Sequence, residues 1–192
     1  MKCRWLLSTI QHPAASKQYM MKKWLYFIVF LSVTGFSRHT QTEAEEYNLK
    51  AAFIYNFTKF IDWNSFISGN EFIIGVVDSS PIYEPLAEIA QTKTVNDKKI
   101  IIRHYRKLDE ISLCHVLFIS RNTSLSLDDI LAKTAAKGML IVSEKAGYAK
   151  QGTAINFVVV NNKLKFEANT KAINSAGLTA SSQLLKLAII VE

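Results

Sequence analysis

Cysteine is scarce in this sequence, and the scarcity excludes two kinds of small exported protein. The 192 residues contain only Cys3 and Cys114, and no pair of CxxC motifs occurs. If Cys3 is removed with an N-terminal leader, the mature chain keeps one cysteine and has no internal disulfide. A disulfide-stabilised scaffold and a cysteine-based zinc site are therefore both excluded, and stability must come from packing of the core.

Catalytic motifs are also missing. The chain has no HExxH, GxSxG or GxGxxG sequence, and these motifs mark metalloprotease, hydrolase and dinucleotide sites. Gly147 to Thr153 (GYAKQGT) has the glycine spacing of a phosphate loop, but Thr153 stands where the essential lysine should be. The segment also precedes an expected strand instead of a helix, so we expect a turn there. The sequence predicts no catalytic, cofactor-binding or metal site, and a protein that is not an enzyme.

The adjacent pair Cys114 and His115 does not make a catalytic dyad. Neighbouring residues on a strand point to opposite faces of a sheet, so a thiol and an imidazole at these positions cannot share a hydrogen bond. We expect Cys114 to be a buried small hydrophobe, with a reactive thiol as the alternative. Neither His104 nor His115 has a second metal ligand at helical spacing.

Acidic residues are absent from residues 1–37, which carry five basic residues. Met20 to Lys23 forms a short basic region, and the apolar run Trp24 to Gly35 has the length of a signal-peptide core and is too short for an ordinary transmembrane helix. We expect a leader over residues 1–37, with cleavage somewhere between 35 and 44 and export to the periplasm; an uncleaved membrane anchor is the alternative. Residues 38–192 carry 18 basic and 16 acidic residues, so the high pI does not indicate nucleic-acid binding.

The rest of the chain predicts one α/β domain over residues 43–192. Apolar spacings of three and four residues predict a first helix over 43–61. Short β-branched runs alternate with helical patterns as far as residue 143, which indicates a mostly parallel sheet with helices on both faces. Residues 154–168 then predict an antiparallel hairpin around Asn161-Asn162, followed by two helices over 169–176 and 181–188. Within this domain, Ser126 is a candidate N-cap for a helix over 127–136.

Two segments carry more apolar surface than a small core needs. They are the first helix, and the Gly177 to Ile190 end together with its hairpin. Surplus apolar surface in a domain without catalytic motifs favours contact with another protein, and burial in the core is the alternative. The basic stretch around Lys99 to Lys107 attracts an anionic ligand in one interpretation and marks the charged ends of a buried strand in the other.

Several segments, in order, resemble the YfiR-like family of periplasmic regulators. They are Glu46 to Trp63 (EYNLKAAFIYNFTKFIDW), Cys114 to Ser120 (CHVLFIS), Gly147 to Phe157, Lys163 to Asn169 (KLKFEAN) and Gly177 to Ala188 (GLTASSQLLKLA). The resemblance implies repression of an inner-membrane diguanylate cyclase through its periplasmic domain, and thereby control of cyclic di-GMP and biofilm. It also allows a homodimer and an unidentified small ligand, and it implies neither a cofactor nor a nucleic-acid partner.

The resemblance further implies that the C-terminal apolar region contacts the partner. The matching positions are Phe166, Asn169, Leu178, Ser181, Leu184 and Leu185. Asn64 and Ala168 depart from the family pattern, and the single mature cysteine leaves no basis for redox control through an internal disulfide. A periplasmic small-ligand receptor that passes its signal to a sensor kinase or transporter is the alternative function.

Overall fold

The computed structural model describes residues 38–63, 69–135 and 138–192, with side chains from residue 43 onward. The expected leader, residues 1–37, lies outside the described residues. Contacts group residues 43–192 into one compact unit. Among the described helices, none combines the length and apolar character that crossing a membrane requires.

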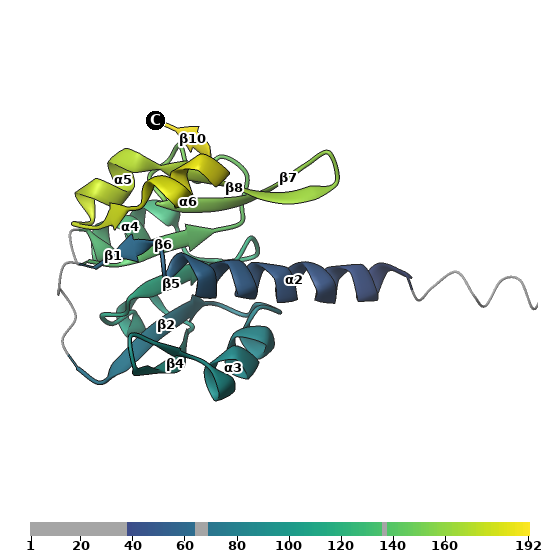
Figure 1. Cartoon of the computed structure of the whole chain (residues 1–192), viewed down its shortest axis with the longest axis horizontal. Helices are drawn as coiled ribbons and strands as arrows, with labels where there is room; N and C mark the ends of the chain where they lie inside the picture. Colours follow the sequence, from purple (N-terminus) through teal and green to yellow (C-terminus); the bar gives the residue numbers. More distant parts are fainter. Residues whose placement is uncertain (1–37, 64–68, 136–137) are drawn as a thin grey trace, which may run out of the picture. The chain divides into compact units, whose positions relative to one another are not determined.

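One mixed sheet of eight strands organises this unit (Figure 1). Its spatial order is β10-β8-β7-β6-β5-β2-β4-β3. The β7–β8 and β3–β4 pairs are antiparallel, and the other neighbours are parallel. The strands are β2 (Glu71–Val77), β3 (Thr94–Val95), β4 (Lys98–Tyr105), β5 (Val116–Ile119), β6 (Leu140–Ser143), β7 (Ile155–Val160), β8 (Lys163–Asn169) and β10 (Ile189–Val191).

The helices follow the strands as the alternating pattern predicts. They are α2 (Arg38–Phe57), α3 (Tyr83–Thr92), α4 (Leu127–Thr134), α5 (Thr170–Ser175) and α6 (Ser182–Leu187), with a short 3-10 turn, η1, at Leu108–Glu110. A separate antiparallel pair joins β1 (Ile61–Asp62) to β9 (Thr179–Ala180). The predicted α/β class is confirmed, and the sheet is mixed and curled.

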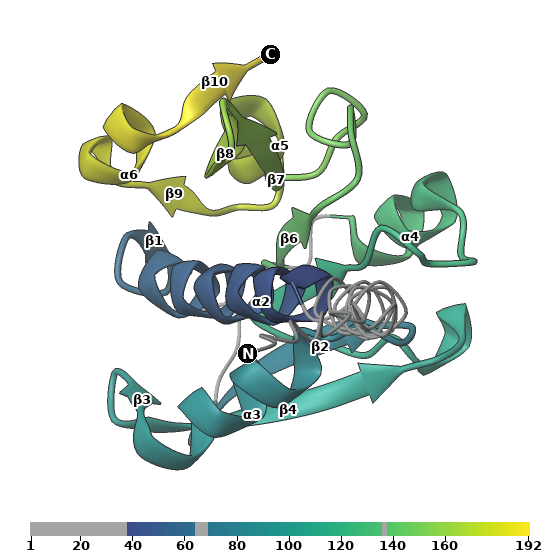
Figure 2. The same cartoon turned by 90° about the vertical axis from the view of Figure 1, so that its right-hand side faces the viewer.

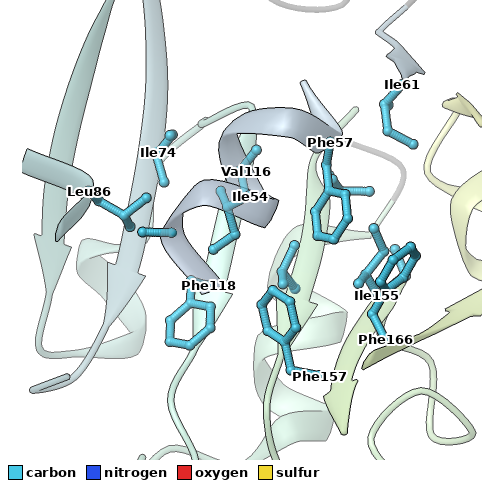
Figure 3. Close-up of a cluster of buried hydrophobic side chains, with 14 of the residues drawn as sticks. Ile54, Phe57, Ile61, Ile74, Leu86, Val116, Phe118, Ile155, Phe157 and Phe166 are labelled. Carbon is cyan, nitrogen blue, oxygen red and sulfur yellow. The ribbon is translucent and has the colours of Figure 1, made fainter. Parts of the chain in front are cut away.

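Helix α2 runs along one face of the curled sheet, between the β2–β4 part and the β7–β8 part (Figure 2). Ile54 and Phe57 of α2 are buried against the centre of the sheet. Figure 3 shows Phe118, Phe157 and Phe166 from three different strands beside them. The Phe57 ring lies 5.0 Å from Phe166 and 6.0 Å from Phe157, measured between ring centroids. The apolar residues that the sequence predicted on this helix are therefore buried in the core.

The opposite face of the sheet has its own apolar cluster under α4. On β5, Val116 and Phe118 face the α2 side, while Leu117 and Ile119 face Ile130 of α4. This alternation is the period-two geometry of a strand. Because both faces are covered, β5 is buried at every position. Helices on both faces of the sheet are thus observed.

Element boundaries differ modestly from those predicted. The first helix ends at Phe57, because Thr58 to Phe60 form a turn that leads into β1. The hairpin turn is confirmed: Asn161 and Asn162 have φ of 51° and 56°, as a two-residue turn of type I′ requires. Ser126 is the N-cap residue of α4, as predicted, but its side chain accepts no hydrogen bond from the helix. Strands β1, β3, β9 and β10 were not predicted.

Candidate functional site

Charged side chains converge where two central parallel strands end. Arg121 follows β5 by two residues and Glu144 follows β6 directly. Glu46 and Lys50 approach them from consecutive turns of α2. Ligands of open α/β sheets bind outside the carboxyl ends of the strands, so this cluster lies at the edge where a functional site is expected.

Lys50 is the most deeply buried charge of the cluster, with only 1% of the residue exposed. Its Nζ lies 2.5 Å from Glu144 Oε2 and 2.5 Å from Glu46 Oε1. The side chain of Glu144 is itself 1% exposed. An isolated charge in the protein interior is very unfavourable, so the contact between these two groups of opposite charge offsets part of the cost of burying them.

Arg121 and Tyr47 complete the coordination of Glu144. The Arg121 backbone N–H donates to Glu144 Oε1 at 3.1 Å, and Arg121 Nη2 lies 3.3 Å from Oε2. The Tyr47 hydroxyl donates to Oε1 at 3.1 Å. Arg121 Nη2 also lies 2.9 Å from Glu46 Oε1. The network pairs two acids with two bases, so its formal charge is zero, and we call these five residues the ion-pair network.

The ion-pair network shifts the pKa of its members in the directions its geometry requires. Burial raises the pKa of Tyr47 to about 12, and the nearby Glu144 carboxylate adds to the effect. Burial opposes ionisation of Glu46, but hydrogen bonds and charges from Lys50 and Arg121 outweigh it and hold its pKa below the usual value. Burial likewise opposes the charge of Arg121, and Glu144 outweighs it and raises the pKa. Arg121 and Glu46 are both charged at neutral pH.

A cavity of about 300 Å³ opens beside the ion-pair network. Its charged wall comes from Glu46, Lys50, Arg121 and Glu144, and its apolar wall comes from the β7–β8 hairpin. The hairpin and neighbouring residues that line it are Ala146, Phe157, Val158, Val159 and Leu164. A pocket with one charged wall and one apolar wall suits a ligand or peptide that has both characters.

The structure assigns a structural role to most of the predicted partner-contact residues. Phe166, Leu178 and Leu184 are 2–3% exposed and belong to the core under α2. Asn169 is 6% exposed; its Oδ1 accepts from Ala172 N at 2.9 Å, and its Nδ2 donates to the Ala149 carbonyl at 2.8 Å.

The other two candidates, Ser181 and Leu185, are half-buried. Ser181 caps α6 by accepting from Leu184 N at 3.2 Å, and Leu185 packs against the core. All six therefore lie around one C-terminal unit of β8, α5 and α6. Contact of these six residues with a partner stays a prediction.

Cys114 and His115 lie just before β5 and belong to different environments, as expected. The Cys114 thiol is buried 3.5 Å from Met139 Sδ, and burial raises its pKa to about 12. His115 Nδ1 accepts from Ile73 N at 3.0 Å, and its ring stacks on Phe72 at 4.2 Å. Burial lowers the His115 pKa to about 4. The expectation of a buried, unreactive thiol agrees with this geometry.

The segment with phosphate-loop spacing has a plain structural role. Residues 146–152 form a turn that leads into β7, as expected for the segment with phosphate-loop spacing. In the part of the chain that the structure describes, no group of three or more His, Cys, Asp or Glu residues could hold a metal ion.

Sequence reasoning missed the ion-pair network, although two signals were present. Glu46 and Lys50 are an i, i+4 pair of opposite charges just before the apolar part of the first helix, and this spacing places the two charges side by side. Arg121 and Glu144 are charged residues that come soon after two short buried strands. The pairing across about 94 residues, from Lys50 to Glu144, has no local signature.

Fold and site together define a small α/β domain in which a solvent-open cavity lies against a buried ion-pair network. A family model described as YfiR/HmsC-like matches residues 47–189, which is nearly the whole described domain. The chain therefore belongs to the YfiR/HmsC-like family, whose members are periplasmic regulators of cyclic di-GMP signalling and are regulatory rather than catalytic. No curated protein matches the sequence.

Proposed function

We propose that this protein is exported to the periplasm and represses a membrane diguanylate cyclase by binding its periplasmic domain. The observation that carries the proposal is the family match over residues 47–189. Repression needs only that the protein bind the inactive cyclase more tightly than the active one. A tenfold effect on output requires a difference in binding free energy of about 1.4 kcal/mol.

The mouth of the cavity is the surface that best suits such a partner. Val159 at the hairpin is 61% exposed and Leu49 on α2 is 48% exposed. Leu49 lies one turn before Phe53, whose ring is 5.9 Å from Phe166 of the hairpin, so Leu49 is on the hairpin side of α2. Glu46 and Arg121 line the cavity together with Val159. Exposed apolar residues beside accessible charges are typical of contacts that form and dissociate.

The test measures intracellular cyclic di-GMP in the host after deletion of the gene and after its restoration. We expect deletion to raise cyclic di-GMP and restoration to reverse the rise. An unchanged level under conditions where the protein is present in the periplasm would contradict the proposal.

Point variants locate the contact surface in the same assay. Leu49→Glu and Val159→Glu change exposed residues, so both proteins should fold and fail to lower cyclic di-GMP. Leu113→Glu is the matched control, because Leu113 is 53% exposed on a different part of the domain. Leu178→Asp and Leu184→Asp are expected to unfold the domain, because both leucines are in the core, and therefore cannot report on partner contact.

A second candidate function, a periplasmic small-ligand receptor for a sensor kinase or transporter, is favoured by the cavity itself. Its volume of about 300 Å³ lies at the lower end of the range found for small-molecule sites. Native mass spectrometry of the protein isolated from the periplasm tests this function. A co-purified small molecule that is lost on Arg121→Ala substitution supports it, and a ligand-free protein with full repressor activity contradicts it.

A further inference from the structure

The β7–β8 hairpin extends beyond the strand that lies on its other side. Strand β6 pairs with β7 only at Ile155 and Asn156, whereas β8 pairs with β7 along its whole length, as far as Val160. Figure 1 shows the hairpin continuing past the end of β6. Among the described strands, none lies beside residues 157–160 on the side away from β8. This side of β7 is therefore an open strand edge.

The register of the hairpin decides which backbone groups point to the open edge. Next to the sheet, the Asn169 N–H donates to the Ala154 carbonyl at 2.9 Å. Hydrogen-bonded and non-hydrogen-bonded pairs alternate along antiparallel strands, so Val158 and Val160 also bond to β8 and Val159 does not. The backbone N–H and C=O of Val159 therefore point to the open edge, where they can pair with another strand.

The cavity beside the ion-pair network lies along this open edge. Phe157, Val158 and Val159 all line it, although successive residues of a strand point to opposite faces of a sheet. A cavity that touches three successive residues lies beside the strand and not over one of its faces. Glu144 and Ala146, which follow the end of β6, also line it. The cavity therefore lies where a further strand would pair with β7.

One face of the open edge is apolar. Phe157 points toward α2, where its ring lies 6.0 Å from the ring of Phe57, measured between centroids. Val159 comes two residues later, so it points to the same face, and it is 61% exposed. Leu49 on the hairpin side of α2 is 48% exposed. Apolar side chains of an added strand would be buried between the hairpin and α2, so they suit this face.

The other face of the hairpin is basic. Lys163 and Lys165 lie on β8 opposite Val160 and Val158, and both lysines are exposed. In the part of the chain that the structure describes, neither lysine forms an ion pair, and residues 157–166 contain no acid. A strand added to β7 would lie about 10 Å from β8, which is two strand spacings. Lysine side chains can lie across the valines toward it, so acidic side chains suit this face.

We propose that an extended segment of the partner protein binds in the cavity as a strand added to the open edge of β7. Apolar residues of this segment point toward α2, and acidic residues alternate with them on the outer face. Recognition of this kind takes its affinity from backbone hydrogen bonds and its specificity from alternate side chains. The inference rests on the proposed function, because it specifies what the cyclase presents to the surface around Val159.

Variants of Val159 separate a backbone contact from a side-chain contact in the cyclic di-GMP assay. Val159→Pro removes the N–H that points to the open edge and leaves the hydrogen bonds between β7 and β8 in place. We expect this variant to lose repression, so that cyclic di-GMP rises to the level of the deletion strain. Val159→Ala is the matched control, because it shortens the side chain and keeps the N–H, and it should retain most of the repression.

Thermal unfolding and periplasmic abundance are measured for both variants, so that loss of the fold is not read as loss of the contact. Full repression by a folded Val159→Pro protein overturns the proposal. An equal loss of repression in Val159→Ala also overturns it, since the contact would then depend on the side chain alone. Unchanged cyclic di-GMP after deletion of the gene contradicts the proposed function instead, so the two failures are distinguishable.

Amide hydrogen exchange of the unsubstituted protein gives a second readout that needs no variant. The Val159 N–H should exchange rapidly in the free protein, whereas the N–H groups of Val158 and Val160 are bonded to β8 and should exchange slowly. The probe is a capped peptide of alternating valine and glutamate. At saturation this peptide should slow exchange at Val159 at least about tenfold, and the same peptide with lysine in place of glutamate should not.

An equal effect of the two peptides, or an unchanged Val159 amide with both, overturns the proposal even if Val159→Pro fails to fold. The exported Val159→Cys protein tests a second copy of this chain as the occupant. Two copies paired at this edge would bring the introduced cysteines within disulfide range, and Cys114 is buried. A disulfide-linked dimer would show that the edge binds its own counterpart and would overturn the proposal, whereas a monomer supports it.

Discussion

At the scale of single residues, the buried pair of Lys50 and Glu144 is the least tolerant feature of the molecule. Removing one member of a buried pair leaves the other charge without its partner, which typically destabilises a protein by about 3 to 5 kcal/mol. Glu46 keeps a contact with Lys50, and Arg121 and Tyr47 keep contacts with Glu144. These remaining partners reduce the loss, so we expect Lys50→Met to lower the free energy of unfolding by about 3 kcal/mol.

Urea unfolding of Lys50→Met, Glu144→Gln and the double variant measures how strongly the pair is coupled. We expect the double variant to lose less stability than the two single losses added together, by about 1 to 3 kcal/mol. Lys150→Met is the matched control, because Lys150 is exposed; its effect should be within about 0.5 kcal/mol. Additive losses would show that the two charges do not stabilise each other.

His115 should make stability depend on pH. In the folded protein its pKa is lowered from 6.5 to about 4, because the imidazole is buried and the charge of Lys98 disfavours a second positive charge. Between these values the unfolded chain binds the proton and the folded chain does not. The contribution of His115 to the free energy of unfolding is therefore fully present above about pH 6.5. It decreases toward pH 4 by as much as about 3 kcal/mol.

Urea unfolding at intervals between pH 7.5 and pH 4.5 measures the effect of His115. The His115→Gln variant removes the titrating group, so subtracting its profile isolates the contribution of the imidazole. We expect the profile of the variant to be flatter over this interval. Two parallel profiles would indicate that His115 titrates normally in the folded state.

Cys114 should be inert to thiol reagents while the domain is folded. With its pKa raised to about 12, only about one thiol in ten thousand is ionised at pH 8, and the thiolate is the reactive form. Cys3→Ser in the full-length chain leaves Cys114 as the single thiol. We expect no colour development with Ellman's reagent over an hour in buffer and one equivalent in 6 M guanidinium. Rapid reaction in buffer would contradict the burial of Cys114.

At the scale of secondary-structure elements, two polar side chains fix the C-terminal helices. Asn169 caps α5 and also binds the Ala149 carbonyl, so Asn169→Ala should destabilise the domain by about 2 kcal/mol. Ser181 only caps α6, so Ser181→Ala should cost about 1 kcal/mol. Ser126→Ala is the control, because Ser126 is the N-cap residue of α4 but its side chain makes no capping hydrogen bond. Thermal unfolding of the three variants measures their losses of stability. Equal losses in all three would contradict the assigned caps.

Strand β2 contains a glycine that sequence reasoning left unexplained. A Cβ at Gly75 would lie 2.6 Å from the Tyr105 ring and 2.9 Å from Leu117 Cδ1. Both neighbours are buried, so the extra atom has no free space. We expect Gly75→Ala to destabilise the domain by about 1 to 3 kcal/mol, measured by urea unfolding. Gly69→Ala cannot serve as the control, because the φ of 130° at Gly69 strains any other residue. Ala146→Ser is the control, because Ala146 is exposed.

The elements that the sequence predicted are those with their own local pattern. The run EFIIGVV predicted β2 at its observed bounds, and Asn161-Asn162 predicted the turn of the hairpin. Strands β1, β3 and β9 have two residues each, which is too short to show a period. Strand β10 has only three residues and directly follows the leucine-rich pattern of α6, so it has no separate pattern of its own.

At the scale of the whole molecule, the site was less predictable than the fold. The α/β class followed from alternating strand and helix patterns, each of which can be identified from its own residues. The ion-pair network joins α2 to the ends of β5 and β6, and only the strand order of the sheet brings them together. The six partner-contact candidates came from a resemblance, and the structure shows that Phe166, Leu178 and Leu184 are needed for the core.

Processing of the N-terminus is a prediction for the whole chain. If the leader is removed, intact mass spectrometry of the periplasmic protein should show a chain that begins at residue 36, 38 or 45, the positions after Gly35, Ser37 and Ala44. Cleavage of this kind leaves the domain over residues 47–189 complete. A full-length mass in the membrane fraction would support an uncleaved anchor instead.

The position of α2 also has a consequence for the kinetics of folding. Its partners Glu144, Phe157 and Phe166 lie about 90 to 110 residues later in the chain. Contacts between such distant segments form slowly, because the intervening chain must first be closed into a loop. A chain that emerges from its N-terminus therefore cannot complete this core until most of its length is available. Until then Lys50 remains hydrated, and the first helix gains no stability from the sheet that later surrounds it.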